Sequence, residues 1–135
     1  MSVGSNARTR VSCQTAVSYS EPYWGTGKNI WWRFARADGE PWALAGIWDE
    51  WTDPQTGEVV PHYSMLTQNC DGHPLLGLMH KPDPKLPADK QDRRSVVPIE
   101  KQDWDAWLHG TIDQASALIQ VPDLELLRHG AADPA

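Results

Sequence analysis

Two side chains of this 135-residue sequence suit proton transfer because of where they stand. Glu21 lies between a Val/Tyr segment and a tryptophan-rich segment, where a carboxylate must be paired or take part in catalysis. His80 ends the short apolar stretch 75–79, and a partly buried histidine that titrates near neutral pH can give or take a proton. Taken one at a time, a solvated glutamate and a hydrogen-bonded histidine are the plainer interpretation of these positions.

A second group of residues has the side chains that nucleic acid needs. Asn6 offers both a donor and an acceptor to a phosphate. If the segment IWWRF is a strand, Trp32 lies on one face and Trp31 and Arg33 lie on the other. A stacking surface beside a cation is what single-stranded nucleic acid requires. The alternative is that these aromatic side chains fill the core of a small β domain.

The tryptophans are concentrated in two segments that read as consecutive strands. Five of the eight stand in TGKNIWWRF (26–34) and PWALAGIWDEW (41–51). The alternating pattern around Asp38-Gly39, a dipeptide that favours a tight turn, predicts a hairpin with strands over about 29–36 and 41–51. We therefore expect two adjacent antiparallel strands to carry Trp31, Trp32, Trp42 and Trp48.

The other segments predict a strand-rich chain that ends in short helices, which is an α+β pattern. An extended segment over 1–20 should end at Glu21-Pro22, because proline restricts the residue before it. The expected elements after the hairpin are a turn over 53–57, a third strand over 59–69, a helical turn over 75–79, an exposed loop over 81–92, a buried strand over 95–99, and helices over 100–108 and 111–118, the second with Thr111 as its N-cap. We expect one domain over 1–120 and a weakly ordered tail over 121–135.

Composition excludes several classes of protein. No run approaches the roughly 18 apolar residues of a membrane span, and the opening MSVGSNARTR has no apolar signal-peptide region, so we expect a cytoplasmic protein. Cys13 and Cys70 form no Cys/His cluster, so we expect neither a metal site nor a cofactor. The net charge of −6 excludes a wholly basic nucleic-acid binder, but residues 1–36 hold five basic side chains against Glu21 alone.

Several short motifs follow one another along the chain. They are Asn6-Ala7-Arg8, Ser18-Tyr19-Ser20-Glu21-Pro22, TGKNIWWRF, Ala45-Gly46-Ile47-Trp48 with Trp51, Met65-Leu66-Thr67 followed by His80, Arg94-Ser95-Val96-Val97-Pro98-Ile99, and Trp107-Leu108. In this order the motifs resemble those of the SRAP family, the SOS-response-associated, abasic-site-processing proteins, and in particular its phage- and proteobacteria-like branch. The resemblance covers about residues 6–108.

The resemblance implies a fold, a reaction and a partner. The fold is α+β, built around a curved, barrel-like antiparallel sheet with a groove for single-stranded DNA. Intact relatives remove their initiator methionine, as a self-processing peptidase, and capture abasic sites through an N-terminal cysteine as a covalent thiazolidine. Carried over by position, and with the stacking argument above, the catalytic residues are Glu21 and His80, and the DNA-binding residues are Asn6, Arg8, Trp32, Arg33 and Arg94. The expected partner is single-stranded DNA with abasic sites, bound by a monomer of bacterial or phage origin.

The sequence departs from the family pattern at its start and within one motif. It begins Met1-Ser2 and therefore lacks the cysteine of the Met-Cys-Gly-Arg start, so we expect an N-terminally shortened SRAP domain. The loop 81–92 separates His80 from Arg94, which are almost adjacent in most members. The alternatives are a non-catalytic single-stranded DNA binding module, a degenerate SRAP paralogue, or an aromatic-rich interaction domain without a DNA role.

Overall fold

The computed structural model describes residues 10–132, which form antiparallel sheets with short helices between and beside them. The first sheet has the order β1-β4-β5 and consists of β1 (Arg10–Ala16), β4 (Trp42–Thr52) and β5 (Val59–Met65). The second has the order β2-β3-β8 and consists of β2 (Tyr19–Tyr23), β3 (Ile30–Arg36) and β8 (Leu127–Ala131). A small third sheet pairs β6 (Thr67–Asn69) with β7 (Arg94–Val96). The expected α+β class is confirmed.

The helices are all short and lie mainly in the second half of the chain. They are η2 (Leu76–Leu78), η3 (Ala88–Lys90), η4 (Lys101–Asp103), α1 (Trp104–His109), α2 (Ile112–Ala117) and η5 (Leu124–Leu126). Thr111 caps α2 as expected, because its side chain accepts from the backbone N–H of Gln114 while the Gln114 side chain accepts from the backbone N–H of Thr111. Between residues 10 and 132 no helix has the length and apolar character to cross a membrane.

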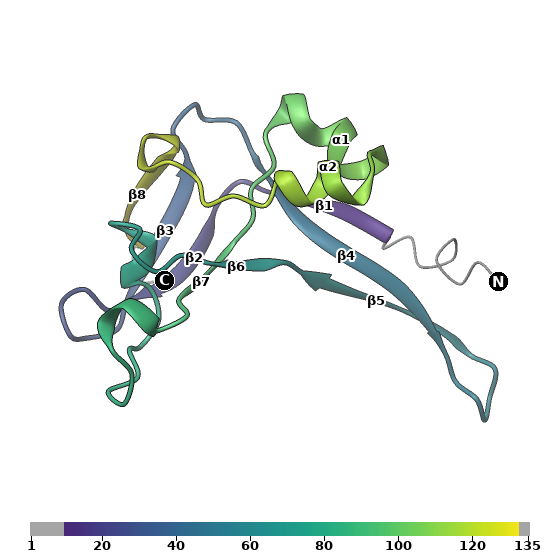
Figure 1. Ribbon diagram of the computed structural model, residues 1–135, viewed down its shortest axis with the longest axis horizontal. Helices are drawn as coiled ribbons and strands as arrows, with labels where there is room; N and C mark the ends of the chain where they lie inside the picture. Colours follow the sequence, from purple (N-terminus) through teal and green to yellow (C-terminus); the bar gives the residue numbers. More distant parts are fainter. Residues whose placement is uncertain (1–9, 133–135) are drawn as a thin grey trace.

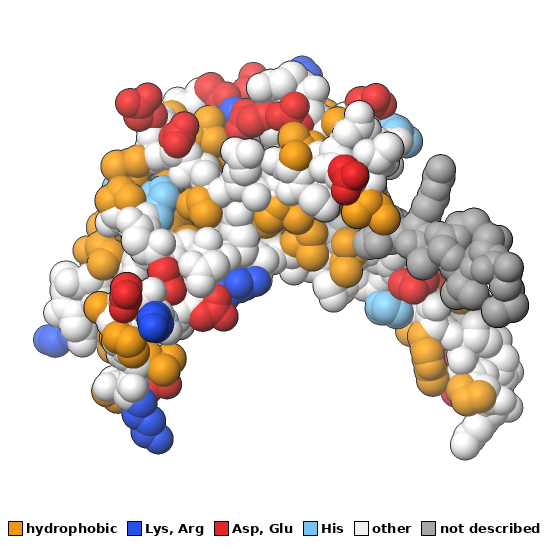
Figure 2. All heavy atoms as spheres, in the orientation of Figure 1, with side chains coloured by type: hydrophobic (Ala, Val, Ile, Leu, Met, Phe, Trp, Pro, Cys, Tyr) orange, Lys and Arg blue, Asp and Glu red, His pale blue; other side chains and the backbone are white. Residues whose placement is uncertain are grey.

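The β4–β5 hairpin projects from the rest of the molecule, as the ribbon in Figure 1 shows. Its turn follows the chemistry expected from the sequence, since Asp53 Oδ1 accepts the Gln55 N–H at 2.8 Å and Gly57 has a φ of 74°. In the same view the molecule is an arch, hollowed between the tip of this hairpin and the lobe that carries η2 and η3 (Figure 2). The hairpin's strand β5 is exposed along its whole length.

The predicted hairpin between β3 and β4 is wrong. The two strands follow one another along the chain, but β3 pairs with β2 and β8, whereas β4 pairs with β1 and β5. The turn itself is present, because the Gly39 N–H donates to the Arg36 carbonyl at 3.1 Å and Gly39 has a φ of 78°. The chain therefore passes from one sheet to the other at this turn.

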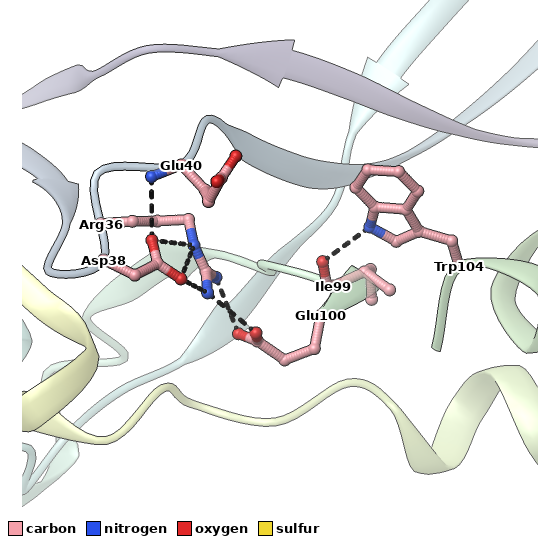
Figure 3. A network of polar contacts seen from close by, with 6 residues as sticks. All are labelled: Arg36, Asp38, Glu40, Ile99, Glu100 and Trp104. Atoms are coloured by element: carbon pink, nitrogen blue, oxygen red, sulfur yellow. Dashed lines mark hydrogen bonds and ion pairs between the residues drawn. The ribbon is translucent and has the colours of Figure 1, made fainter. Parts of the chain in front are cut away.

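A network around Arg36 holds that crossing in place (Figure 3). The Arg36 guanidinium lies 2.7 Å from Asp38 within the turn and 2.9 Å from Glu100 at the start of η4. Asp38 also accepts the backbone N–H of Glu40, and the Arg36 guanidinium lowers the pKa of Asp38 below its ordinary value. One cation thus joins the turn to the segment that leads into α1.

The tryptophans divide between the core and the surface. Trp42 and Phe34 are fully buried in a cluster between the two larger sheets, and Trp42 Nε1 donates to the Phe34 carbonyl at 3.3 Å. Trp107 belongs to a second buried cluster under α1. Trp31 and Trp51 are more than half exposed, at 57% and 53%. The core-filling interpretation is therefore correct for Trp42 and Trp107, whereas Trp31 and Trp51 lie on the surface.

Three other expectations differ from the structure. Glu21-Pro22 lies inside β2 and does not end an extended segment, because β2 continues to Tyr23 and pairs with β3. The expected strand over 59–69 is interrupted at Leu66, whose N–H donates to the Ala45 carbonyl and so redirects the chain from β5 to β6. The tail over 121–135 is not weakly ordered throughout, because residues 127–131 form β8 against the free edge of β3.

The loop over 81–92 is exposed as expected and contains only η3.

Candidate functional site

Glu21 and His80 lie in contact although 59 residues separate them in the sequence. Glu21 Oε2 is 3.2 Å from His80 Nε2, and the two side chains are 22% and 43% exposed. The backbone creates this contact, since the His80 N–H donates to the Pro22 carbonyl at 2.6 Å and Met79 forms a bridge with Tyr23. The structure therefore brings together the two residues that the family resemblance names.

His80 is held in an unusual backbone conformation. Its φ of 66° lies in the left-handed region, which non-glycine residues adopt rarely and often at functional sites. Arg93 supports it, because the guanidinium donates to the carbonyls of Met79 and, at 2.8 Å, of His80. Arg93 is itself fixed by Asp71, whose carboxylate accepts the Arg93 backbone N–H at 2.9 Å. The result is a histidine that the surrounding backbone positions against Glu21.

The surroundings of the pair change the proton affinity of its carboxylate. Burial raises the pKa of Glu21 above its ordinary value of 4.5, and the charge of His80 lowers it in part. Burial, together with the charge of Glu21, also raises the pKa of Tyr19, which precedes Glu21 on the same face of β2. A carboxylate of raised proton affinity beside an imidazole can exchange a proton with it, which is the arrangement that acid–base catalysis uses.

The structure places the proposed DNA-binding residues in three different environments. Trp32 packs inward, with its ring 4.6 Å from that of Tyr23 and its Nε1 donating to His129 Nδ1 at 3.1 Å. Arg33 is exposed on the opposite face of β3. Arg94 is exposed and donates to the Thr67 carbonyl at 2.9 Å. Asn6 and Arg8 lie outside the described residues.

Sequence reasoning misses two residues of this region. Arg93 carries no motif of its own, and only its place beside Arg94 in the last motif could have drawn attention to it. His129, which accepts from Trp32, has no signal in the sequence at all. Both act through contacts between segments far apart in the chain, which a local pattern does not record.

Neither cysteine has the environment of a reactive thiol. Burial raises the pKa of Cys13 above its ordinary value and raises that of Cys70 to about 11. Cys13 is half-buried in β1, and Cys70 is 1% exposed in the core. The thiolate is the nucleophilic form, so both residues are poor nucleophiles at neutral pH. Over residues 10–132 no cluster of His, Cys, Asp or Glu could hold a metal ion.

The comparison with protein families decides the family of this chain. The sequence model of the family described as SOS response associated peptidase (SRAP) matches residues 8–129. The chain belongs to the SRAP family. It is therefore a DNA-damage-associated SRAP protein, and the resemblance seen in its motifs is confirmed. A search of curated proteins gives no match.

Two crystal structures of SRAP-fold proteins are similar to this chain. A protein from Bordetella bronchiseptica is 28% identical, with a TM-score of 0.78, and the match covers 93% of this chain and 56% of that chain. A protein from Bacteroides thetaiotaomicron is 18% identical, with a TM-score of 0.72 over 91% of this chain and 49% of that chain, and this likeness concerns the fold alone. The chain thus spans about half the length of these solved structures. The expected SRAP-like fold is confirmed.

Proposed function

We propose that this SRAP domain binds single-stranded DNA at abasic sites and that Glu21 and His80 move protons at the opened sugar. The observation that carries the proposal is the 3.2 Å contact between Glu21 Oε2 and His80 Nε2 at a partly buried position of an SRAP domain. A glutamate whose pKa is raised by burial and a histidine held by its backbone have the chemistry of an acid–base pair.

The reaction that fits this pair is the condensation of an amine with the ring-opened aldehyde of the lesion. The amine nitrogen adds to C1′, and the carbonyl oxygen takes up a proton to give a carbinolamine. A base then removes a proton from nitrogen while an acid protonates the hydroxyl, which leaves as water and gives the imine. Glu21 and His80 supply one base and one acid for these steps. Closure to a thiazolidine would need an amine and a thiol on one residue.

A second candidate function is a single-stranded DNA binding module without covalent chemistry. It is favoured by the cysteines, because the pKa of each thiol is raised by burial and neither is placed as a nucleophile. Both candidates share DNA binding, and they differ in whether sodium borohydride traps an imine between the protein and abasic DNA. For this chain we expect an adduct that depends on borohydride and no heat-stable adduct without it.

DNA binding is tested by fluorescence anisotropy with labelled single-stranded oligonucleotides that differ only at one position. One carries a central tetrahydrofuran, a stable analogue of an abasic site, and the other carries a normal nucleotide. We expect tighter binding of the analogue, and affinity that falls with salt at a log–log slope of about 0.7 for each phosphate contacted. An affinity that does not change with salt concentration, or no binding at all, would contradict the proposal. Either result would favour an interaction domain without a DNA role.

A further inference from the structure

The outer face of the β2-β3-β8 sheet carries exposed side chains that the Glu21–His80 pair does not use. The register places Trp31 opposite Pro22, Arg33 opposite Gly130, and Ala35 opposite Arg128, with Ser20 completing the face. Trp31 is 57% exposed, and Arg33 and Arg128 are exposed. This face is separate from the inward face of β3, where Trp32 and Phe34 pack.

The charge of this outer face is opposite to that of the whole chain. The chain has a net charge of −6, yet the seven side-chain positions that the strands place here include two arginines and no carboxylate. Among residues 10–132, neither Arg33 nor Arg128 forms an ion pair or a side-chain hydrogen bond. The two are diagonal neighbours across β3 and β8, a spacing of about 7 Å. Two guanidinium groups at that spacing, with no carboxylate partner within the described part of the chain, favour an anion between them.

The space over Gly130, beside the two arginines, is open. A Cβ added at Gly130, which stands opposite Arg33 and on the same face as Arg128, would meet no atom within 4 Å. The backbone of β8 is therefore accessible at this point, and no neighbouring side chain fills the slot. A phosphate oxygen could approach there without displacing part of the protein.

The Glu21 side chain and the outer face lie on opposite faces of β2, and the segment 78–80 runs along the edge of β2 where the two faces meet. Pro22 pairs with Trp31 on one side, while its carbonyl accepts the His80 N–H on the other. Trp31 and His80 are therefore about two strand spacings apart, or roughly 10 Å. A strand of DNA that passes from the pair around this edge of β2 reaches Trp31 first and the arginines next.

We propose that this face binds the continuation of the single strand whose abasic site lies at the Glu21–His80 pair, and the proposal rests on the proposed function. One base stacks on Trp31, and a following phosphate lies between Arg33 and Arg128. The occupant is single-stranded because a base can lie flat on an exposed indole only when it has left its own stack. The exposed tryptophan thereby extends the site beyond the lesion itself.

The test compares two lengths of single-stranded DNA, each with a central tetrahydrofuran. One has about 3 nucleotides and reaches only the pair, and the other has about 15 and reaches the outer face. We expect Trp31→Ala to weaken binding of the longer strand by about 10-fold and to leave the shorter unchanged, with Trp31→Phe restoring most of the loss. Arg33→Ala with Arg128→Ala should lower the salt slope for the longer strand by about 0.7, which corresponds to the one phosphate placed between the two arginines.

Controls separate this proposal from the proposed function. Trp51→Ala removes a similarly exposed tryptophan, at 53%, from the distant β4–β5 hairpin and should leave both affinities unchanged. If the wild type binds both lengths and Trp31→Ala has the same affinity for each, the proposal for the outer face is wrong and the proposed function stands. If the wild type binds neither strand, the proposed function fails and this proposal fails with it. If the substitutions weaken binding to a duplex as much as to the longer strand, the face recognises phosphates of any DNA and the stacking proposal is wrong.

Discussion

Glu21→Gln should lower the rate at which borohydride-trappable adduct forms with abasic single-stranded DNA by about 10²–10⁴-fold. The substitution keeps the size of the side chain and removes its capacity to accept a proton. His80→Ala should lower the rate to a similar extent, because the two side chains form one pair at 3.2 Å. The measurement is the initial rate of adduct formation under saturating DNA, which separates proton transfer from binding.

A second histidine–carboxylate pair provides the control. His109 Nδ1 lies 3.0 Å from Asp105 Oδ1 on α1, and its side chain is 73% exposed. His109→Ala should leave the rate within twofold of the wild type. Equal losses in His109→Ala and His80→Ala, or an unchanged rate in Glu21→Gln, would contradict the assigned role.

The pH dependence of the same rate follows from the direction in which the pKa of Glu21 is shifted. Because burial raises this pKa above 4.5, the carboxylate takes up a proton at a higher pH than an ordinary glutamate does. A step that needs the carboxylate as base should therefore slow down at a pH above 4.5 when the pH is lowered. Glu21→Gln should abolish this acid limb.

Trp42→Ala is expected to give the largest loss of stability, about 3–5 kcal/mol in free energy of unfolding. The Trp42 side chain is fully buried, its ring lies 5.6 Å from that of Tyr19, and the Arg36 guanidinium lies 5.6 Å from its centre. Truncation leaves a cavity between the two larger sheets and removes the hydrogen bond to the Phe34 carbonyl. Since the free energy of unfolding of domains of this size is only about 5–15 kcal/mol, this loss removes a large part of the stability of the fold.

Urea denaturation followed by circular dichroism checks this prediction. Trp51→Ala is the matched control, because Trp51 is 53% exposed on the same strand β4 and should lose no more than about 0.5 kcal/mol. Equal midpoints for the two variants would show that Trp42 does not hold the sheets together.

Features with local causes could be predicted from the sequence. The turn over 53–57 follows from the bond that an aspartate makes to the next backbone groups. Trp104, Trp107 and Leu108 predict the helix α1 by their spacing, and Thr111 predicts the start of α2 by its capping chemistry. Each of these depends on residues no more than five apart.

Strand partners could not be predicted in the same way, because pairing depends on segments far apart in the chain. The alternating pattern identifies β3 and β4 as strands but carries no information on their neighbours. The contacts that accompany the crossing are equally distant in the sequence, since Arg36 binds Glu100 across 64 residues. Strand β8, with the sequence LRHGA, has too weak a pattern to be recognised without the edge of β3 that it covers.

The candidate site was predicted in part, and through motif order more than through any single residue. Glu21 and His80 are ordinary positions when each is read alone, and the family resemblance joined them. The contribution of Arg93 was not visible, because it binds the backbone carbonyls of Met79 and His80 and therefore requires no particular partner side chain. The inward packing of Trp32 was also hidden, since it depends on Tyr23 and His129 from two other strands.

The contact between the lesion and the Glu21–His80 pair is tested most directly by nitrogen-15 NMR of the histidine side chains. The chain is titrated with single-stranded DNA that carries a tetrahydrofuran, and then with the intact oligonucleotide. We predict that the His80 ring resonances shift saturably, and more with the abasic analogue than with intact DNA, while those of His109 on α1 stay in place. Resonances of His80 that do not move while anisotropy shows the DNA to be bound would contradict the account.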